Sequence, residues 1–112
     1  AVKGSRILVL GLAYKKNIDD TRESPAVEIM SLLQDKGAQV AYSDPHVPSF
    51  PQKRDYHFDL HSIELMPTNI SHYDCLVLAT DHDTFDYGTL SKHARLIIDT
   101  RGRLQGENVV NA

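Results

Sequence analysis

The chain has 112 residues, of which 41% are hydrophobic and 24% charged, a length and composition typical of one domain with a single hydrophobic core. Its formal net charge of −3 excludes a general electrostatic attraction to nucleic acid or to an anionic membrane, so any bound anion must be held locally. The single cysteine, Cys75, excludes an internal disulfide, and neither a signal peptide nor a long apolar run is present. We therefore expect a cytoplasmic protein without a membrane segment.

The first part of the chain predicts a strand, a helix and a second strand. Residues 6–11 form a short apolar run, which is typical of a strand buried on both faces of a parallel sheet. Ser24 and Pro25 form a helix-start signal, and the helix is predicted to run to about Lys36. A second strand is predicted over residues 38–43. Apolar residues at helical spacing predict the buried stripe of the helix: Ala26, Ile29, Met30 and Leu33.

The second part predicts further strands around one short helix. Apolar and polar side chains alternate loosely over residues 58–66 and predict a short edge strand. Pro67 is expected to limit any helix after it. Residues 74–80 predict a second buried strand, 84–94 a short helix and 95–100 another apolar strand. No element is assigned to the remaining residues at the end of the chain.

The alternation of strands and helices predicts a three-layer α/β domain of Rossmann-like fold, with a mainly parallel sheet flanked by helices. Such sheets bind ligands beyond the carboxyl ends of their strands. We therefore expect the chemistry of this domain on one rim of the sheet. The strand ends on that rim carry four groups of residues: 11–16, 44–45, 80–82 and 99–101.

The loop after the first strand contains cations and acids in similar number. A helix amino terminus at Ser24, flanked by Lys15 and Arg22, presents free amides and partial positive charge to a phosphate or diphosphate. Arg101 is placed to add a two-pronged contact to the same anion. Alternatively, the cations pair on a solvated loop with its acids. Spacing alone favours this second interpretation somewhat and leaves both open. The charged residues of the loop are Lys15, Lys16, Asp19, Asp20, Arg22 and Glu23.

Other kinds of site find little support in the sequence. A dinucleotide-binding fingerprint needs several spaced glycines, but this turn has only Gly11. His57 with His61, and the cluster 81–83, lack a third ligand at metal-binding spacing, so ordinary surface or edge histidines are expected. Cys75 lies within an apolar strand and is expected to be a buried, inert thiol. We predict no metal site and no catalytic residue in this chain.

Five segments of the chain carry specific sequence motifs. They are ILVLGLAYKK (7–16), DDTRESPA (19–26), GA followed by SDP (37–45), DCLVLATDHDTF (74–85) and IDTR (98–101). Together these segments closely resemble the carboxyl-terminal domain of the UDP-glucose/GDP-mannose dehydrogenase family. The resemblance is long and specific, and it is least distinctive over residues 46–72. Within the family, the motif sequences are most similar to those of UDP-N-acetylglucosamine or UDP-N-acetylmannosamine 6-dehydrogenases.

The resemblance implies a fragment of a larger enzyme. Residues 1–5 are then the end of a linker from upstream domains, and 6–112 are the UDP-binding domain. In the family, the full enzyme oxidises the C6 alcohol of a nucleotide sugar to a carboxylate with two NAD equivalents, through a thioester on a cysteine of the preceding domains. The fragment itself is then not catalytic. NAD is held mostly by the missing domains, which are its partners together with the UDP-sugar, and the full-length enzyme is expected to be a homodimer or larger.

The resemblance also implies roles for individual residues. Tyr14 and Lys15 match positions that contact the diphosphate and nucleoside of the nucleotide sugar, and Arg101 matches an arginine that helps to bind the UDP end. Arg22 matches an arginine that reaches the NAD side of the cleft between domains. Tyr14 stands where many glucose-type members have phenylalanine. Apart from the resemblance, we hypothesise that the acids between Lys15 and Arg22 keep the loop ordered and the cations pointed.

A second hypothesis comes from a different functional class. The chain is then a stand-alone regulatory module of Rossmann-like fold that binds an anion or a nucleotide. A glycine fingerprint and a cysteine-containing catalytic segment upstream of Ala1 would favour the dehydrogenase, whereas a start codon near Ala1 would favour the module. The identity of the sugar is not predicted, because its ring would be held largely by the missing domains.

Overall fold

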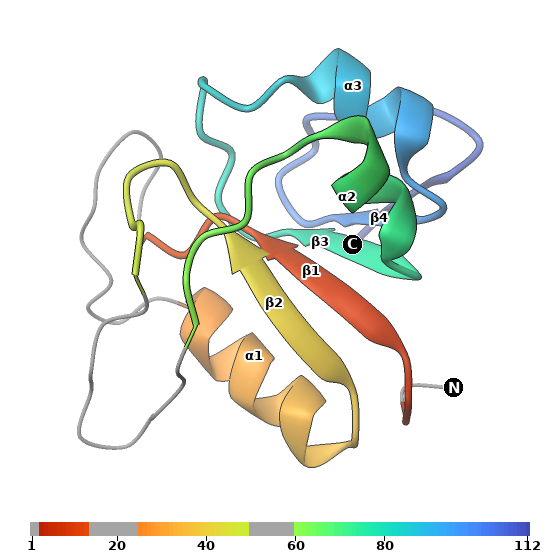
Figure 1. The fold of residues 1–112 in the computed structure, drawn as a ribbon. Helices are drawn as coiled ribbons and strands as arrows, with labels where there is room; N and C mark the ends of the chain where they lie inside the picture. The colour runs from red at the N-terminus through yellow and green to blue at the C-terminus, as the bar shows by residue number, and fades with distance from the viewer. Residues whose placement is uncertain (1–2, 14–24, 50–59) are drawn as a thin grey trace.

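The computed structural model describes residues 3–13, 25–49 and 60–112. They contain a five-stranded sheet in the order β2-β1-β3-β4-β5, in which every neighbouring pair is parallel. Helix α1 covers one face, and α2 and α3 cover the other (Figure 1). The predicted three-layer, Rossmann-like α/β fold is therefore confirmed. The elements are β1 (Arg6–Leu10), α1 (Pro25–Asp35), β2 (Gln39–Ser43), α2 (Pro67–His72), β3 (Cys75–Leu78), α3 (Tyr87–His93), β4 (Ile97–Asp99) and β5 (Val109–Asn111).

Strand β1, which lies between β2 and β3, is buried on both faces, as its unbroken apolar run predicted. Leu8 and Leu10 belong to the same buried cluster as Leu90 of α3, whereas Val9 belongs to a cluster with Met30 of α1. Alternate side chains of a strand point to opposite faces, so one strand contributes to both cores. Each fully buried aliphatic side chain contributes about 1.5–3 kcal/mol relative to exposure.

Helix α1 agrees closely with the predicted helix. It ends at Asp35, one residue before the predicted end. Ala26 and Met30 of the predicted stripe are buried, and Val27 is buried beside them. Leu33 is only half-buried, because it lies toward the end of the helix, in a smaller cluster with Ile7 and Val77.

Two predictions for the segment before β3 are wrong. Where the structure describes the predicted edge strand over 58–66, the chain is irregular from residue 60, apart from an antiparallel bridge between Ser49 and His61. Pro67 begins α2 instead of limiting a helix, because a proline in the first turn gives up an amide that has no helical partner there.

In the carboxyl-terminal third, the predicted helix and strands are present, but they begin and end at other residues than predicted. Helix α3 starts at Tyr87 and not at residue 84, because Asp86 is its N-cap and accepts a hydrogen bond from the amide of Thr89 at 3.1 Å. Strands β3 and β4 are shorter than predicted. Strand β5 was not predicted and pairs with β4. None of the helices in the described ranges is long and apolar enough to cross a membrane.

Candidate functional site

The turns that follow β1 and β3 pack directly on each other at the carboxyl edge of the sheet. Gly11 has a φ of +88°, and a Cβ added to it would lie 2.5 Å from both Cβ and the carbonyl oxygen of Thr80. The Thr80 hydroxyl donates a hydrogen bond to the carbonyl oxygen of Ala13 at 2.6 Å. Ala13 is the last residue that the structure describes before Tyr14 and Lys15, so these contacts fix the position of the chain up to that point.

Asp44, directly after β2, joins the ends of three strands through one fully buried carboxylate. Its Oδ2 accepts hydrogen bonds from the amides of Leu12 at 2.7 Å and Ala13 at 3.0 Å. The same oxygen lies 2.8 Å from Nε2 of His82, in the turn after β3. Its Oδ1 accepts from the amide of His46 at 2.8 Å. The carboxylate therefore ties the turns after β1, β2 and β3 together.

The hydrogen bonds at Asp44 keep this buried group ionised. Burial alone would raise the pKa of Asp44, but the bond with His82 and the amides of Ala13, Leu12 and His46 outweigh it, and the pKa lies below its ordinary value. Hydrogen bonds to the charged form of a carboxyl favour that form. The Asp44 carboxylate is thus a buried anionic group beneath the rim.

The expectation of ordinary surface or edge histidines is wrong for His82, which is completely buried. The hydrogen bond with Asp44 compensates for the burial of its polar ring. His61 is exposed and lies 3.1 Å from the hydroxyl of Ser49, whereas His57 lies outside the described residues. In the part of the chain that the structure describes, no three His, Cys, Asp or Glu side chains are grouped to hold a metal ion.

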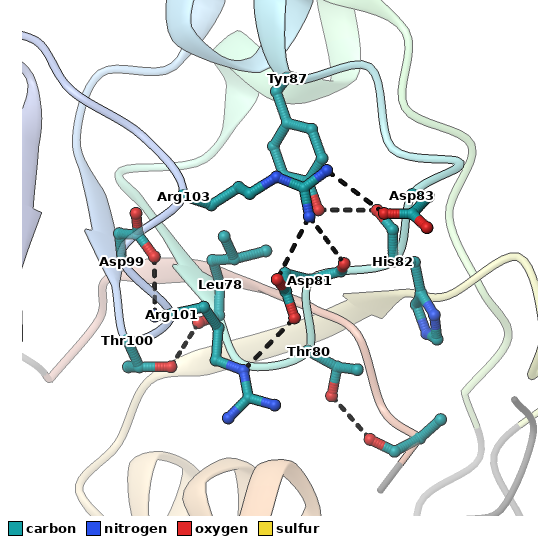
Figure 2. A network of polar contacts seen from close by, with 11 residues as sticks. Leu78, Thr80, Asp81, His82, Asp83, Tyr87, Asp99, Thr100, Arg101 and Arg103 are labelled. Carbon is teal, nitrogen blue, oxygen red and sulfur yellow. Dashed lines mark hydrogen bonds and ion pairs between the residues drawn. The ribbon is translucent and has the colours of Figure 1, made fainter. Parts of the chain in front are cut away.

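Arg101 follows β4 and has a firmly held backbone with an exposed side chain. The carboxylate of Asp99 accepts hydrogen bonds from the amides of Arg101 at 2.8 Å and Leu104 at 2.7 Å. The Thr100 hydroxyl donates to the carbonyl oxygen of Leu78 at 2.6 Å. The Arg101 side chain is 42% exposed, and its Nε lies 3.5 Å from Oδ1 of Asp81 (Figure 2).

A second arginine, Arg103, lies on the other side of Asp81 and has several partners. Its Nη1 is 3.2 Å from Oδ2 of Asp81, and its Nη2 is 3.3 Å from Oδ1 of Asp83. Its guanidinium carbon lies 4.5 Å from the centre of the Tyr87 ring. The Tyr87 hydroxyl donates in turn to the carbonyl oxygen of His82 at 2.7 Å. Figure 2 shows this network, which connects the ends of β3 and β4 with the start of α3.

A hollow of about 370 Å³ lies beside the rim, between the end of β2 and the turn before α3. Ser43, Ser62 and Phe85 are among its lining residues, and Glu64 and Asp86 give it acidic groups. Arg101 is not among the lining residues, so the hollow is separate from the arginine network.

Of the four predicted ligand-binding residues, the structure places Arg101 on the rim at the end of β4. Tyr14, Lys15 and Arg22 lie outside the described residues. The network of Arg103 was not predicted. A signal for it exists in the sequence, since Asp81 and Asp83 follow one predicted strand and Arg101 and Arg103 follow the next, at the same two-residue spacing.

The single cysteine has the character of a structural residue. Cys75 is half-buried at the start of β3, at the edge of the sheet opposite the rim. Burial, together with the nearby charge of Asp74, raises the pKa of its thiol despite an opposing hydrogen bond from Ile98. A thiol with a raised pKa is a poor nucleophile at neutral pH. The predicted burial of this thiol is wrong in extent, because Cys75 stands at the start of the strand and is only half-buried.

Residues 8–106 match the family model described as the UDP-glucose/GDP-mannose dehydrogenase family, UDP binding domain. The chain belongs to this family. The UDP-N-acetyl-D-mannosamine dehydrogenase of Methanococcus vannielii is 35% identical over 111 residues, which cover 92% of this chain and 24% of the relative. The NDP-N-acetyl-D-galactosaminuronic acid dehydrogenase of Ralstonia nicotianae is 35% identical over 107 residues, with the same coverage of 92% and 24%.

Solved structures from the family have the same fold. The UDP-D-ManNAc dehydrogenase of Pyrococcus horikoshii is 27% identical, with a TM-score of 0.67, over 92% of this chain and 23% of that one. The NDP-N-acetyl-D-galactosaminuronic acid dehydrogenase of Methanosarcina mazei Go1 matches 97% of this chain and 24% of its own with a TM-score of 0.71; at 24% identity it supports the fold alone. The chain thus spans about a quarter of the length of the relatives it matches.

Proposed function

We propose that this chain is the UDP-binding domain of an NAD-dependent UDP-sugar 6-dehydrogenase, which oxidises the C6 alcohol of the sugar to a carboxylate. The match to the UDP binding domain of the family over residues 8–106 supports it. So do relatives that are named as dehydrogenases of UDP-N-acetyl-D-mannosamine and of an NDP-N-acetyl-D-galactosaminuronic acid. In this proposal residues 1–5 end a linker, and residues 6–112 bind UDP.

The observation that carries the proposed site is the placement of Arg101. Its guanidinium is exposed and has one long contact, through Nε, with Asp81. Among the described residues neither of its Nη nitrogens has a partner, and in Figure 2 both point away from Asp81. A guanidinium edge with two parallel N–H groups matches the oxygens of a phosphate. We therefore assign the diphosphate of UDP to this edge.

The rim supplies the remaining contacts in this proposal. Ala13 is held by Asp44 and Thr80 at the end of β1, so the chain enters the segment of Tyr14 and Lys15 from a fixed point on the rim. We assign Tyr14 to the nucleoside and Lys15 to the diphosphate, together with Arg101. UDP-sugar is then the substrate of the full enzyme, and the other domains of the dehydrogenase close the site from the opposite side.

The NAD part of the proposal concerns the full enzyme. The sequence after β1 has Gly11 but lacks the further spaced glycines with which a dinucleotide-binding turn approaches the pyrophosphate. We therefore assign NAD mostly to the other domains, with Arg22 as a contact from this one. The full enzyme would act as a homodimer or larger assembly.

The proposal is tested by UDP affinity measured on the 112-residue chain. Half of a two-domain site has lost preorganised partners, so a dissociation constant of about 1 mM is expected. Lys15→Gln and Arg101→Gln should each weaken UDP binding about tenfold, because each removes a charge-assisted contact to phosphate. The unfolding midpoint of Arg101→Gln in urea should stay close to that of the original chain, since the Arg101 side chain is 42% exposed. We expect the same of Lys15→Gln.

A matched control is Arg95→Gln, since Arg95 is 59% exposed and pairs with Asp74 at the opposite edge of the sheet. It removes the same charge from the chain, yet UDP affinity should not change. Equal loss of affinity in Arg95→Gln and Arg101→Gln would show that only net charge matters and would reject the assigned site.

A further inference from the structure

The two arginines that share Asp81 are held very differently. Arg101 touches Asp81 only through Nε at 3.5 Å. Arg103 contacts the same carboxylate at 3.2 Å, the carbonyl oxygen of Asp81 at 3.3 Å and Asp83 at 3.3 Å, and it covers the ring of Tyr87. The guanidinium of Arg103 is therefore fixed by four contacts, whereas the two Nη nitrogens of Arg101 have no partner among the described residues.

This difference arises because each oxygen of the Asp81 carboxylate contacts a different arginine. Oδ2 faces Nη1 of Arg103, and Oδ1 faces Nε of Arg101. A carboxylate without a second partner prefers to bind a guanidinium through two parallel hydrogen bonds. Without Arg103, both oxygens of Asp81 would be available to Arg101, and the edge that now points away would turn toward the carboxylate.

We propose that Arg103 is a positioning residue for nucleotide binding: it occupies Asp81 and so keeps the terminal edge of Arg101 available for the diphosphate. This inference rests on the proposed UDP site. Arg103 itself does not touch the ligand, because both of its terminal nitrogens are engaged by Asp81 and Asp83. Asp81 then acts as an internal competitor of the phosphate, and Arg103 limits that competition.

The surroundings of Arg103 suit this role. Tyr87 lies under its guanidinium and is anchored through its hydroxyl to the backbone of His82, in the turn that also carries Asp81 and Asp83. A cation over an aromatic face is stabilised by the ring quadrupole. The arginine is therefore fixed on a rigid support, and its hold on Asp81 does not depend on the ligand.

The test measures the dissociation constant of UDP for variants of the 112-residue chain. Arg103→Gln should raise the dissociation constant of UDP about threefold to fivefold, which corresponds to the free energy of a partly exposed ion pair. Adding Asp81→Asn to that variant should restore the affinity to within about twofold of the original chain, because an amide does not hold Arg101 by a charged pair. Arg103→Lys, which keeps the charge opposite Asp81, should stay close to the original affinity.

The matched control is the double variant R103Q/D83N, which has the same net charge as R103Q/D81N. Asp83 lies well apart from Arg101 in Figure 2 and pairs with Arg103. Its change should not restore affinity. Equal rescue by D81N and D83N would show a purely long-range charge effect and overturn the inference, as would unchanged affinity in folded Arg103→Gln.

The same series separates this inference from the proposed function. If Arg101→Gln also leaves UDP affinity unchanged, the proposed site itself fails. If Arg101→Gln weakens binding while Arg103→Gln does not, the site stands and only the positioning role is rejected. An amide spectrum of each variant establishes that it is folded. If Arg103→Gln is not folded, Arg103→Met replaces it, because it keeps an unbranched apolar side chain against Tyr87 and removes the charge opposite Asp81, and the same loss of affinity is expected.

Discussion

At the scale of single residues, the rim depends most on the Asp44 carboxylate. It accepts hydrogen bonds from three backbone amides and lies against His82, all inside the protein. A buried charge with this many partners is costly to disturb, because its partners are left without an acceptor.

Asp44→Asn should therefore lower the free energy of unfolding by about 3 kcal/mol, since an amide supplies one oxygen where the carboxylate supplies two. Urea denaturation followed by circular dichroism measures this change. Asp35→Asn is a suitable control, because Asp35 is exposed at the end of α1 and its change should cost less than about 0.5 kcal/mol. Similar midpoints for the two variants would contradict the role given to Asp44.

The same carboxylate makes stability depend on pH. The pKa of Asp44 is lower in the folded chain than its ordinary value of 3.8, so the unfolded chain binds more protons in acid. This stabilisation is fully present above pH 3.8 and is lost as the pH falls through the folded pKa. Asp74 and Asp86 also have lowered pKa values, so they too contribute to the loss of folding stability in acid.

The contribution of Asp44 is isolated by comparing urea midpoints of the original chain and Asp44→Asn between pH 7 and pH 3. The difference between them should be constant near neutrality and should shrink toward pH 3, because the original chain loses a contribution that the variant already lacks. A difference that grows on acidification would show the opposite sign and reject an ionised Asp44.

At the scale of elements, the turn after β1 controls how the rim is assembled. Gly11→Ala combines a positive φ with a Cβ only 2.5 Å from the backbone of Thr80, so β1 and the turn after β3 would have to separate. We expect a loss of about 2–4 kcal/mol, from left-handed strain and from the clash.

Gly4→Ala is the matched control for that turn. Gly4 also has a positive φ, of +82°, but an added Cβ meets nothing within 4 Å. Only the strain of about 1–2 kcal/mol applies there. Thermal or urea unfolding of both variants separates the two effects, and equal losses would mean that the approach of Thr80 to Gly11 is unimportant.

The elements that sequence reasoning predicted are those with a strong apolar signal. β1 and β3 are continuous apolar runs buried on both faces, and α1 has a clear helical stripe. α2 and β5 are short, and β5 is half-buried or exposed throughout, so neither produces a pattern that differs from a loop. Their formation depends on neighbours that the sequence does not reveal locally.

The site was predicted only in part for a similar reason. Arg101 was found by its position after a strand and by resemblance. The network around it depends on the register of β3 and β4, in which Leu78 pairs with Asp99, and this register brings Asp81 opposite Arg101. The burial of His82 depends likewise on Asp44, 38 residues away. Local spacing cannot reveal contacts between strands so distant in sequence.

At the scale of the whole molecule, the parallel sheet places all these groups on one edge. The buried Asp44 and His82 fix the turns, Arg101 extends from the neighbouring strand end, and Ala13 leads into the segment of Tyr14 and Lys15. This arrangement is the basis of our proposal that the rim forms one half of a nucleotide site.

The most direct test of this account is a two-dimensional amide NMR titration of the labelled 112-residue chain with UDP, and separately with NAD. We predict that UDP shifts the amides of Ala13, Asp81 and Arg101 and those of residues 14–24, with half-saturation at about 1 mM, and that NAD shifts them less. Shifts confined to the hollow around Ser62 and Glu64, or no shifts at about 10 mM UDP, would contradict a UDP site on this rim.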